Sequence, residues 1–577
     1  MSVSPRRGVA LRGASSSPST LAAAVVIVGV VLLAFSGGAA AVGEPTDVEG
    51  VDEVSVDGES PGDVPIDERA ADPLDNETGT TEVVVRFTPI DDPDAEGAAA
   101  VDELRNHADD EQEAFERFAD ETDHVTIHRE FWLANALLVS VDANETDSAD
   151  LRSVANVTDV HDNVVVATHD GVAIDPTLDG SNPTREQVDA DPAGPHTQGL
   201  ELIAVPTAWD RFDTRGAGAT VAVIDTGVDP GHQDIELAAW ADFDENGTLV
   251  SDDVTDATDP DGHGTHVAGT VAGGNASGTH IGVAPDASIH GINAFGEDGS
   301  ATFAGVLAAM EHATADEDVD VLQMSLGATG TFRGFIAPVR NARAAGAIVV
   351  AASGNEGENT SSAPANVHDA LAVGAVRSDE NRTVAEFSSG EEIDSTEAFG
   401  EFPDDWPARY VVPDVTAPGV GVISAESGTT DGYVRQQGTS MASPHVSGLA
   451  ALAVAATDSR IEPDGLQASL VETAVHPGGP DVEPDHRHGH GVVDAPGAVA
   501  AAVDAAPPPD PEPAGNGGTD ANRDETAEDD PPVGDDTPGF GPVPAVVAIL
   551  IALVASVIAG RFRDGNGTRG SGPPGSP

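Results

Sequence analysis

The chain has 577 residues, of which 100 are Asp or Glu and 25 are Lys or Arg, so its formal net charge at pH 7 is −75. Every basic residue is an arginine, and there is no cysteine. The missing cysteine excludes disulfides and a lipidated N-terminal cysteine, and the acidic balance opposes nucleic acid as a partner.

The acidic residues are spread over the whole chain rather than gathered in one tail. Self-repulsion of this size destabilises a compact fold unless salt screens it, and at molar salt the Debye length shrinks to about 3 Å. The composition therefore predicts an extremely halophilic source. The alternative is an ordinary acidic secreted protein, whose fold and activity would survive in dilute buffer.

Residues 1–43 have the architecture of a secretory signal peptide, since arginines precede an apolar run at 21–35 and small residues follow it. Two of the arginines, Arg6 and Arg7, are adjacent, as in twin-arginine signals. Export by this route and by the general secretory route both stay open. An acidic linker is expected at 44–79.

Residues 80–167 are predicted to form a small ferredoxin-like α+β domain. Its expected elements follow the order βαββαβ, with strands at 82–87, 125–130, 136–141 and 160–166 and helices at 101–119 and 148–154. The next stretch, 168–199, is rich in Asp, Pro and Gly and is expected to be a cleavable linker.

Residues 200–505 alternate between two kinds of apolar pattern. Strands are expected at 220–224, 287–293, 319–326 and 347–352, and helices at 302–315 and 335–345. This alternation predicts an α/β domain with a parallel sheet flanked by helices. Functional side chains of such sheets gather at the carboxyl ends of strands, where Asp225 and Asn355 fall.

Three short segments of this region carry the residue types of nucleophilic catalysis. Asp225 ends an expected strand, His263 begins the segment His-Gly-Thr-His, and Ser440 follows Gly-Thr at the start of an apolar helix. A serine nucleophile needs a base, and the base needs a carboxylate that orients it. Singly, each residue is more often a turn or cap residue; together, in the order Asp, His, Ser, they predict a protease.

The segments around these three residues resemble the signatures of the subtilisin-like serine proteases. The resemblance implies that Asp225 orients His263, that His263 is the general base and acid, and that Ser440 is acylated. It also implies an oxyanion hole made by the side chain of Asn355 and the backbone N–H of Ser440. His266, three residues after the base, is expected to be structural rather than part of a metal pair.

The resemblance places the substrate as well. The primary pocket would be walled by Ser325, Leu326, Gly327, Ala352, Ser353 and Gly354. An extended protein or peptide substrate would pair with a strand at 324–327 and a second strand at 296–299. These walls hold no buried charge, so an apolar or aromatic residue before the scissile bond is expected, while Glu356 at the rim could admit a basic one.

By the same resemblance, residues 80–167 are the chain's own inhibitory propeptide, removed by self-cleavage within 168–199. No cofactor is required for the chemistry. Structural calcium stays open: Asp234 matches a calcium-binding position of the family, but Ala276 stands in the partner loop where the family has asparagine. The histidines at 486, 488 and 490 are expected on a solvated strand edge rather than on a metal.

The C-terminal part is predicted to hold no second globular domain. Residues 506–537 read as a disordered acidic, Pro-rich spacer, and 564–577 as a tail. Between them, 538–563 contains a mainly apolar stretch of twenty residues at 540–559, about 30 Å of helix, followed by arginines, which predicts a membrane anchor with the protease outside the cell. Its Pro-Gly-Phe start resembles haloarchaeal sorting signals, in which a lipid replaces the span.

The favoured function is therefore a self-processing serine endopeptidase at the cell surface. A surface protein that uses an inactive protease fold for adhesion or binding is the alternative from another class. A processing protease dedicated to one partner would share the same residues, and its specificity would lie in the acidic insertion at 391–409.

Overall fold

The computed structural model describes residues 72–75, 77–90, 93, 95–168, 186–188, 194–296 and 299–508, with the backbone alone for 186–188. The described residues up to Pro507 belong to one compact unit, and Pro508 begins a second. The predicted signal peptide and C-terminal apolar segment, and most of the linker and spacer, lie outside the described residues.

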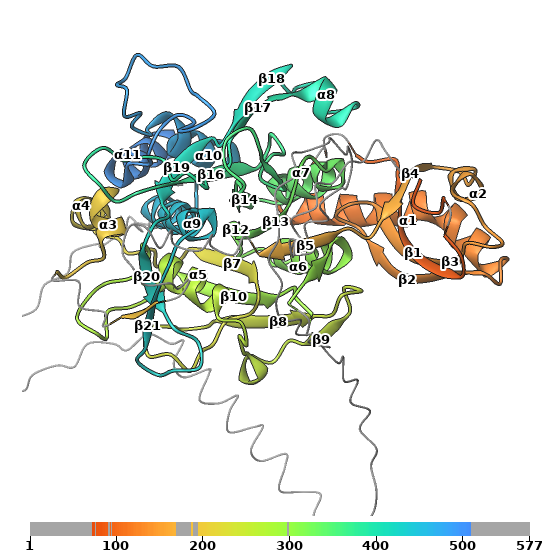
Figure 1. Ribbon diagram of the computed structural model, residues 1–577, viewed down its shortest axis with the longest axis horizontal. Helices are drawn as coiled ribbons and strands as arrows, with labels where there is room; N and C mark the ends of the chain where they lie inside the picture. Colours follow the sequence, from red (N-terminus) through yellow and green to blue (C-terminus); the bar gives the residue numbers. More distant parts are fainter. Residues whose placement is uncertain are drawn as a thin grey trace, which may run out of the picture. The chain divides into compact units, whose positions relative to one another are not determined.

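The N-terminal domain is a four-stranded antiparallel sheet with two helices, drawn in orange in Figure 1. Its elements are β1 (Thr80–Phe87), α1 (Ala98–Asp120), β2 (Val125–Phe131), β3 (Ala136–Asp142), α2 (Ser148–Arg152) and β4 (Val157–Asp162), with the sheet order β2-β3-β1-β4. This is the βαββαβ order of elements. Helix α1 packs on one face because its buried residues, such as Leu104, Ala108 and Phe115, recur every three or four positions.

The other face of this sheet is buried against the larger domain. Side chains of a strand alternate between faces, so Leu137 of β3 belongs to the core under α1, whereas Leu138 points the opposite way. Leu138 and Phe131 share an apolar cluster with Phe303, the first residue of helix α6 (Phe303–Thr314). The two domains therefore have a common apolar core.

The expected single strand at 160–166 is wrong. Strand β4 ends at Asp162, and a separate strand, β5 (Val165–Thr168), pairs with the large domain. The chain turns between them because the side chain of Asn163 and the carbonyl of Val164 accept the first two amide N–H groups of α6, at 3.0 and 2.8 Å. The turn thus caps a helix of the other domain.

The large domain is built on an eight-stranded mixed sheet. Its strands are β7 (Thr220–Asp225), β8 (Ala239–Phe243), β9 (Leu249–Ser251), β10 (Ser288–Asn293), β12 (Val321–Met324), β14 (Ile348–Ala352), β16 (Leu371–Val376) and β19 (Val415–Pro418). The order is β19-β16-β14-β12-β7-β10-β8-β9, and every neighbouring pair is parallel except β8 and β9. The predicted parallel sheet is confirmed.

Helices cover both faces of this sheet (Figure 1). One face carries α5 (His263–Ala272), α9 (Thr439–Ala456), α10 (Pro463–Glu472) and α11 (Ala495–Ala505), and the other carries α6 and α7 (Ile336–Ala344). Strand β7 supplies Val221 and Val223 to the core under α5 and α9. Its alternate residues, Ala222 and Ile224, belong to the core under α6 and α7. Because both faces are buried, its sequence is continuously apolar instead of alternating.

Smaller elements complete the domain. They are β6 (Glu186–Val188), α3 (Gln198–Leu202), α4 (Val205–Phe212), η2 (Val254–Asp256), β11 (Ala301–Thr302), β13 (Leu326–Thr329), η3 (Arg333–Phe335), β15 (Ser362–Ala363), β17 (Glu391–Asp394), α8 (Ser395–Phe399), β18 (Arg409–Val412), β20 (Val422–Ala425) and β21 (Tyr433–Gln436). The acidic insertion forms the β17–β18 hairpin with α8 at its tip, and Trp406 packs on Phe399 inside it.

Two further expectations are corrected. The strand expected at 319–326 is two strands, β12 and β13, separated at Ser325. The histidines at 486, 488 and 490 lie on a loop rather than on a strand edge, and an isolated bridge between Asp485 and Gly489 closes that loop. Within the described ranges no helix has the length and apolar character needed to cross a membrane, and the predicted span is not among them.

Candidate active site

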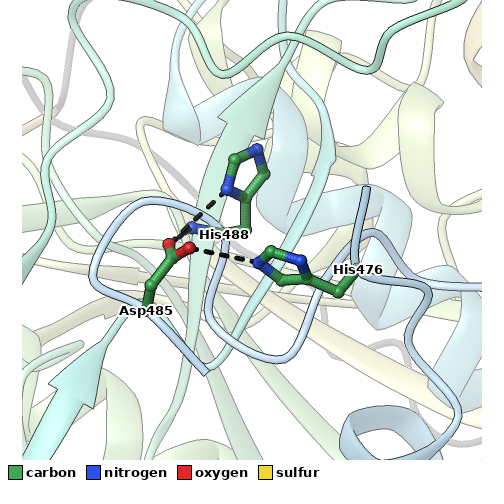
Figure 2. Close-up of side chains that lie close together, drawn as sticks. All are labelled: His476, Asp485 and His488. Carbon is green, nitrogen blue, oxygen red and sulfur yellow. Dashed lines mark hydrogen bonds and ion pairs between the residues drawn. The ribbon is translucent and has the colours of Figure 1, made fainter. Parts of the chain in front are cut away.

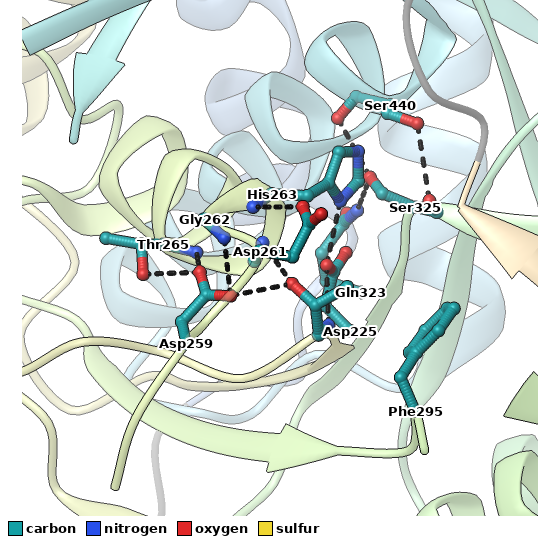
Figure 3. Close-up of polar contacts among 12 residues, drawn as sticks. Asp225, Asp259, Asp261, Gly262, His263, Thr265, Phe295, Gln323, Ser325 and Ser440 are labelled. Atoms are coloured by element: carbon teal, nitrogen blue, oxygen red, sulfur yellow. Dashed lines mark hydrogen bonds and ion pairs between the residues drawn. The ribbon is translucent and has the colours of Figure 1, made fainter. Parts of the chain in front are cut away.

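The three residues expected to form the catalytic triad lie together. Asp225 is the last residue of β7, His263 is the first residue of α5, and Ser440 is the second residue of α9. Oδ1 of Asp225 is 2.7 Å from Nδ1 of His263, and both side chains are almost completely buried, at 0% and 1% exposure. Figure 3 shows the imidazole between the Asp225 carboxylate and Ser440.

A buried polar chain attaches the start of α9 to the strand below it. Gln323 of β12 donates to Oγ of Ser325 at 2.8 Å, and Ser325 donates to the carbonyl of Ser440 at 2.8 Å (Figure 3). The amide oxygen of Gln323 accepts from Ser443 at 3.0 Å and from Ser447 at 2.5 Å. The hydroxyl of Ser440 donates back to the carbonyl of Ser325 at 3.3 Å. These bonds hold the first turns of α9 in place.

Asp259 joins the strand that bears Asp225 to the helix that bears His263. Its Oδ1 accepts from the hydroxyl of Thr226 at 2.9 Å and from the N–H of Gly262 at 2.7 Å, and Oδ2 accepts from the N–H and hydroxyl of Thr265 at 2.8 and 2.6 Å. Burial raises the pKa of Asp259 to about 6, although these donors and the nearby N-terminus of α5 favour the carboxylate.

Asn355 lies just beyond the end of β14, as the sequence predicts. Its side-chain oxygen accepts from the N–H and the hydroxyl of Thr439, both at 3.0 Å. Thr439 immediately precedes Ser440, so the amide group of Asn355 is oriented by the first turn of α9. The preceding residue, Gly354, has φ of +112°, and a Cβ there would lie 2.6 Å from the carboxylate of Glu356. Only glycine suits this position.

The residues expected to wall the primary pocket are all buried and come from two strand ends. Ser325, Leu326 and Gly327 lie at the break between β12 and β13, and Ala352, Ser353 and Gly354 lie at the end of β14. Beside them, Ser389 donates to the carboxylate of Glu356 at 2.9 Å and accepts its N–H at 3.0 Å. Glu356 is itself exposed, so the charge stays at the rim.

Strand β5 of the N-terminal side lies between two strands of the large domain. It pairs antiparallel with β13, with Thr168 opposite Leu326, and antiparallel with β11, with Val166 opposite Ala301. The second substrate strand expected at 296–299 is wrong, because the N–H of Gly299 bonds the carbonyl of Gly296 in a turn. The strand on that side is β11, a few residues further on.

The residues around Asp234 do not fit a calcium ion. The carboxylate of Asp234 accepts the N–H of Ala276 at 2.6 Å and the hydroxyl of Tyr433 at 2.5 Å. The amide of Asn275 faces His280 at 3.1 Å. Calcium needs six to eight oxygen ligands, whereas this loop directs N–H and O–H donors at the one carboxylate.

The sequence profile of the subtilase family matches residues 216–491. Subtilisin DY of Bacillus licheniformis is 39% identical over 243 residues, which are 41% of this chain and 77% of the relative. The chain belongs to the subtilase family. Alkaline elastase YaB of Bacillus sp. (strain YaB) is 36% identical over 255 residues, 44% of this subtilase and 58% of the relative. Subtilisin Savinase of Lederbergia lenta is 36% identical over 254 residues, 44% and 82% of the two chains.

This subtilase is accordingly a subtilisin-like serine endopeptidase with the subtilisin-like α/β fold. The family match begins at residue 216, so the N-terminal domain precedes it. Within the match, His266 is buried and its Nε2 donates to the carbonyl of Val422 at 3.1 Å, away from the Asp225–His263 pair.

Sequence reasoning missed Gln323, Asp259 and Thr439. A polar residue inside the apolar run of β12 was a usable signal for Gln323. Asp259 precedes the Asp-Gly-His segment in a loop rich in aspartate, where nothing local distinguishes it from its neighbours.

Proposed function

We propose that this subtilase is a secreted endopeptidase, anchored at the cell surface and adapted to high salt, which hydrolyses peptide bonds with Asp225, His263 and Ser440. The observation that carries the proposal is the buried 2.7 Å pair between Asp225 and His263 at the start of the helix next to Ser440. The Asp225 bond to Nδ1 leaves Nε2 of His263 as the nitrogen that serves the nucleophile.

In the proposed reaction the hydroxyl of Ser440 turns from the Ser325 carbonyl to Nε2 of His263. The oxygen attacks the substrate carbonyl carbon while its proton passes to Nε2, and the carbonyl oxygen becomes an oxyanion. The C–N bond then breaks, and the leaving amine takes the proton from His263. Water repeats the sequence on the acyl enzyme, so the carboxylic acid leaves and Ser440 regains its proton.

The oxyanion is assigned to the side-chain N–H of Asn355 and the backbone N–H of Ser440. Support comes from Thr439, whose two bonds to the side-chain oxygen of Asn355 leave the nitrogen as the end of the amide that serves the site. A single donor of this kind contributes about 3 kcal/mol, a value known for subtilisin itself.

The N-terminal domain is proposed as the inhibitory propeptide. Strand β5 supports this because it occupies the groove between β11 and β13 in antiparallel pairing, as an extended peptide would. Thr168, the last described residue of β5, lies opposite Leu326, and the residue before Leu326 is Ser325, whose carbonyl is 3.3 Å from Oγ of Ser440. We therefore place the self-cleavage directly beyond Thr168, at the start of the predicted linker.

The mature N-terminus tests this register. Intact-mass and N-terminal analysis of the processed wild-type protein should give a first residue within about three positions of Thr168, because pairing register fixes which carbonyl reaches Ser440. The Ser440→Ala chain, purified alone, should keep the segment. A new N-terminus near residue 199, or processing of Ser440→Ala alone, would contradict the proposal.

We propose that the primary pocket prefers an apolar or aromatic residue before the scissile bond. The pocket walls are buried and uncharged, and the acidic side chain of Glu356 is held at the rim by Ser389. The Asp234 loop does not fit calcium, so no step and no structural role is given to that ion. Two parts of the proposal rest on the sequence pattern alone. They are the signal peptide and the C-terminal segment, which is either a membrane anchor or a sorting signal replaced by a lipid.

A narrower role, processing of one partner, is supported by one observation. The β17–β18 hairpin leaves the fold directly after Ser389 and Gly390, and Gly390 forms a bridge with Glu358 beside the pocket rim. Digestion of a peptide library in high salt by wild type and Ser440→Ala separates the possibilities. Broad serine-dependent cleavage supports the general endopeptidase, a narrow profile supports the processing role, and no serine-dependent cleavage would leave the adhesion alternative.

A further inference from the structure

The loop after α10 brings three metal-ligating side chains together, outside the candidate active site. Figure 2 shows His476, Asp485 and His488 turned toward one another. Nε2 of His476 is 3.1 Å from Oδ2 of Asp485, and Nδ1 of His488 is 3.5 Å from Oδ1. One ligand atom from each residue lies within 4.8 Å of the other two. We propose that this trio, the His476–Asp485–His488 site, binds one zinc-type divalent ion with a structural role.

The donor set selects the class of ion. Two imidazole nitrogens and one carboxylate oxygen suit zinc and its neighbours in the first transition row, whereas calcium and magnesium prefer oxygen alone. Zinc bonds these atoms at about 2.1 Å, which puts tetrahedral ligands about 3.4 Å apart. The two His–Asp separations are of this size, but each joins a different oxygen of Asp485, so side-chain movement has to bring both imidazoles to one oxygen and close the His–His separation. Water completes the fourth position.

The site is partly organised by its own backbone. Oδ1 of Asp485 accepts the N–H groups of Arg487 and His488, both at 2.8 Å, which fixes the carboxylate. Nδ1 of His488 is enclosed and makes no hydrogen bond to any residue described in the structure. Burial lowers the pKa of His488.

At His476 a proton has to move. The N–H of Gly478 donates to Nδ1 at 3.0 Å, so the ring proton is on Nε2, facing Asp485. When the ion takes the lone pair of Nε2, the ring proton sits on Nδ1 instead, and the Gly478 N–H turns away. The adjacent Gly479 has φ of +104°, a conformation that glycine adopts and leaves at low cost. No group is oxidised or reduced.

The ion would link the two ends of a loop that touches the pocket rim. Arg487 donates to the carbonyl of Ser388 at 2.6 Å and to that of Ala385 at 3.0 Å. Ser389, the next residue, holds the carboxylate of Glu356. The chain has no cysteine, so a disulfide cannot cross-link this loop. A bound metal ion would cross-link it instead.

The test uses the full chain with Ser440→Ala, which prevents self-digestion and does not depend on whether the enzyme proposal holds. The protein is treated with EDTA, exchanged into metal-free buffer that contains molar KCl, and titrated with Zn²⁺ alone and with Co²⁺ alone. We expect one tight equivalent, the visible absorption of tetrahedral cobalt, and a rise in the unfolding temperature of about 2 °C or more with zinc. Amide exchange at Gly478 should speed up on binding.

Three variants decide the site. His476→Gln and His488→Gln should each weaken binding by at least about tenfold and remove the cobalt absorption. His486→Gln is the matched control, because His486 is on the same loop but bonds Glu358 at 3.1 Å. The proposal is overturned if the apo protein takes up no tight equivalent, or if both site variants bind as the control does.

Discussion

The bond between Asp225 and His263 determines which ring nitrogen carries the proton. An asparagine at this position keeps the size of the side chain but can present its N–H₂ group to Nδ1, which favours the wrong tautomer. The effect of such a change is therefore chemical rather than structural.

We expect Asp225→Asn to lower kcat by about 10⁴-fold while KM changes little. Hydrolysis of a peptide substrate in high salt measures both constants, and thermal unfolding of the same variant is the control for folding. Loss of activity that merely follows loss of fold would count against the assigned role.

Asn355 and Thr439, the residue that orients it, should contribute differently to kcat. Asn355→Leu removes the proposed oxyanion donor and should lower kcat by about 10²- to 10³-fold with little change in KM. Thr439→Val removes the hydroxyl, which bonds the Asn355 side-chain oxygen and the backbone of Gly354, and keeps the backbone N–H bond to Asn355, so its loss should be smaller. Equal losses in the two variants would contradict this division of roles.

The site residues that could be predicted stand in recognisable sequence segments, whereas the others depend on partners far away in the chain. Asp225, His263 and Ser440 stand in long distinctive segments, so they could be predicted. Gln323 acts through Ser443 and Ser447, which lie 120 and 124 positions further along the chain, and only the folded chain brings these groups together.

At the scale of elements, helix α6 is the surface on which the N-terminal domain rests. Glu311 of α6 accepts the N–H of Leu133 at 2.9 Å and faces Arg129 at 3.5 Å. Burial raises the pKa of Glu311 to about 7, and the bonds to Leu133 and Arg129 lower it by less. An acid whose pKa is raised by docking takes up a proton on docking, so docking is favoured at low pH.

The docked state should therefore be most stable below the ordinary glutamate pKa and weaken as pH rises through about 7. Hydrogen exchange of the peptide containing Leu133, in the Ser440→Ala chain and corrected for intrinsic rates, should lose protection between pH 5 and pH 8. Glu311→Gln removes the titrating group and should flatten this dependence. An unchanged pH profile in that variant would exclude Glu311 as its cause.

Sequence periodicity predicts where the long strands and helices lie but not where every strand ends. The strands and helices of the large sheet could be predicted because their apolar runs are long. The breaks at Asp162 and Ser325 could not, because apolar residues continue past both positions. At the first break, the decisive interaction is with α6, more than 130 residues away in sequence, and no local pattern records it.

At the scale of the whole molecule, the excess of 75 negative charges is the dominant electrostatic feature. If the protein is adapted to salt, the unfolding temperature of Ser440→Ala should rise steeply between 0.1 M and 3 M KCl, because screening relieves self-repulsion. Sucrose, which stabilises proteins without screening charge, is the control. A flat response to KCl, or an equal response to sucrose, would support the ordinary acidic protein instead.

The position of β5 between β11 and β13 would also set the kinetics of the proposed self-activation. The strand and the groove belong to one chain, so the proposed first cleavage is a unimolecular event whose rate does not depend on protein concentration. Removal of the released domain by other enzyme molecules is bimolecular. Activity should therefore appear after a lag that shortens as the protein is concentrated, while the first cleavage keeps the same half-time.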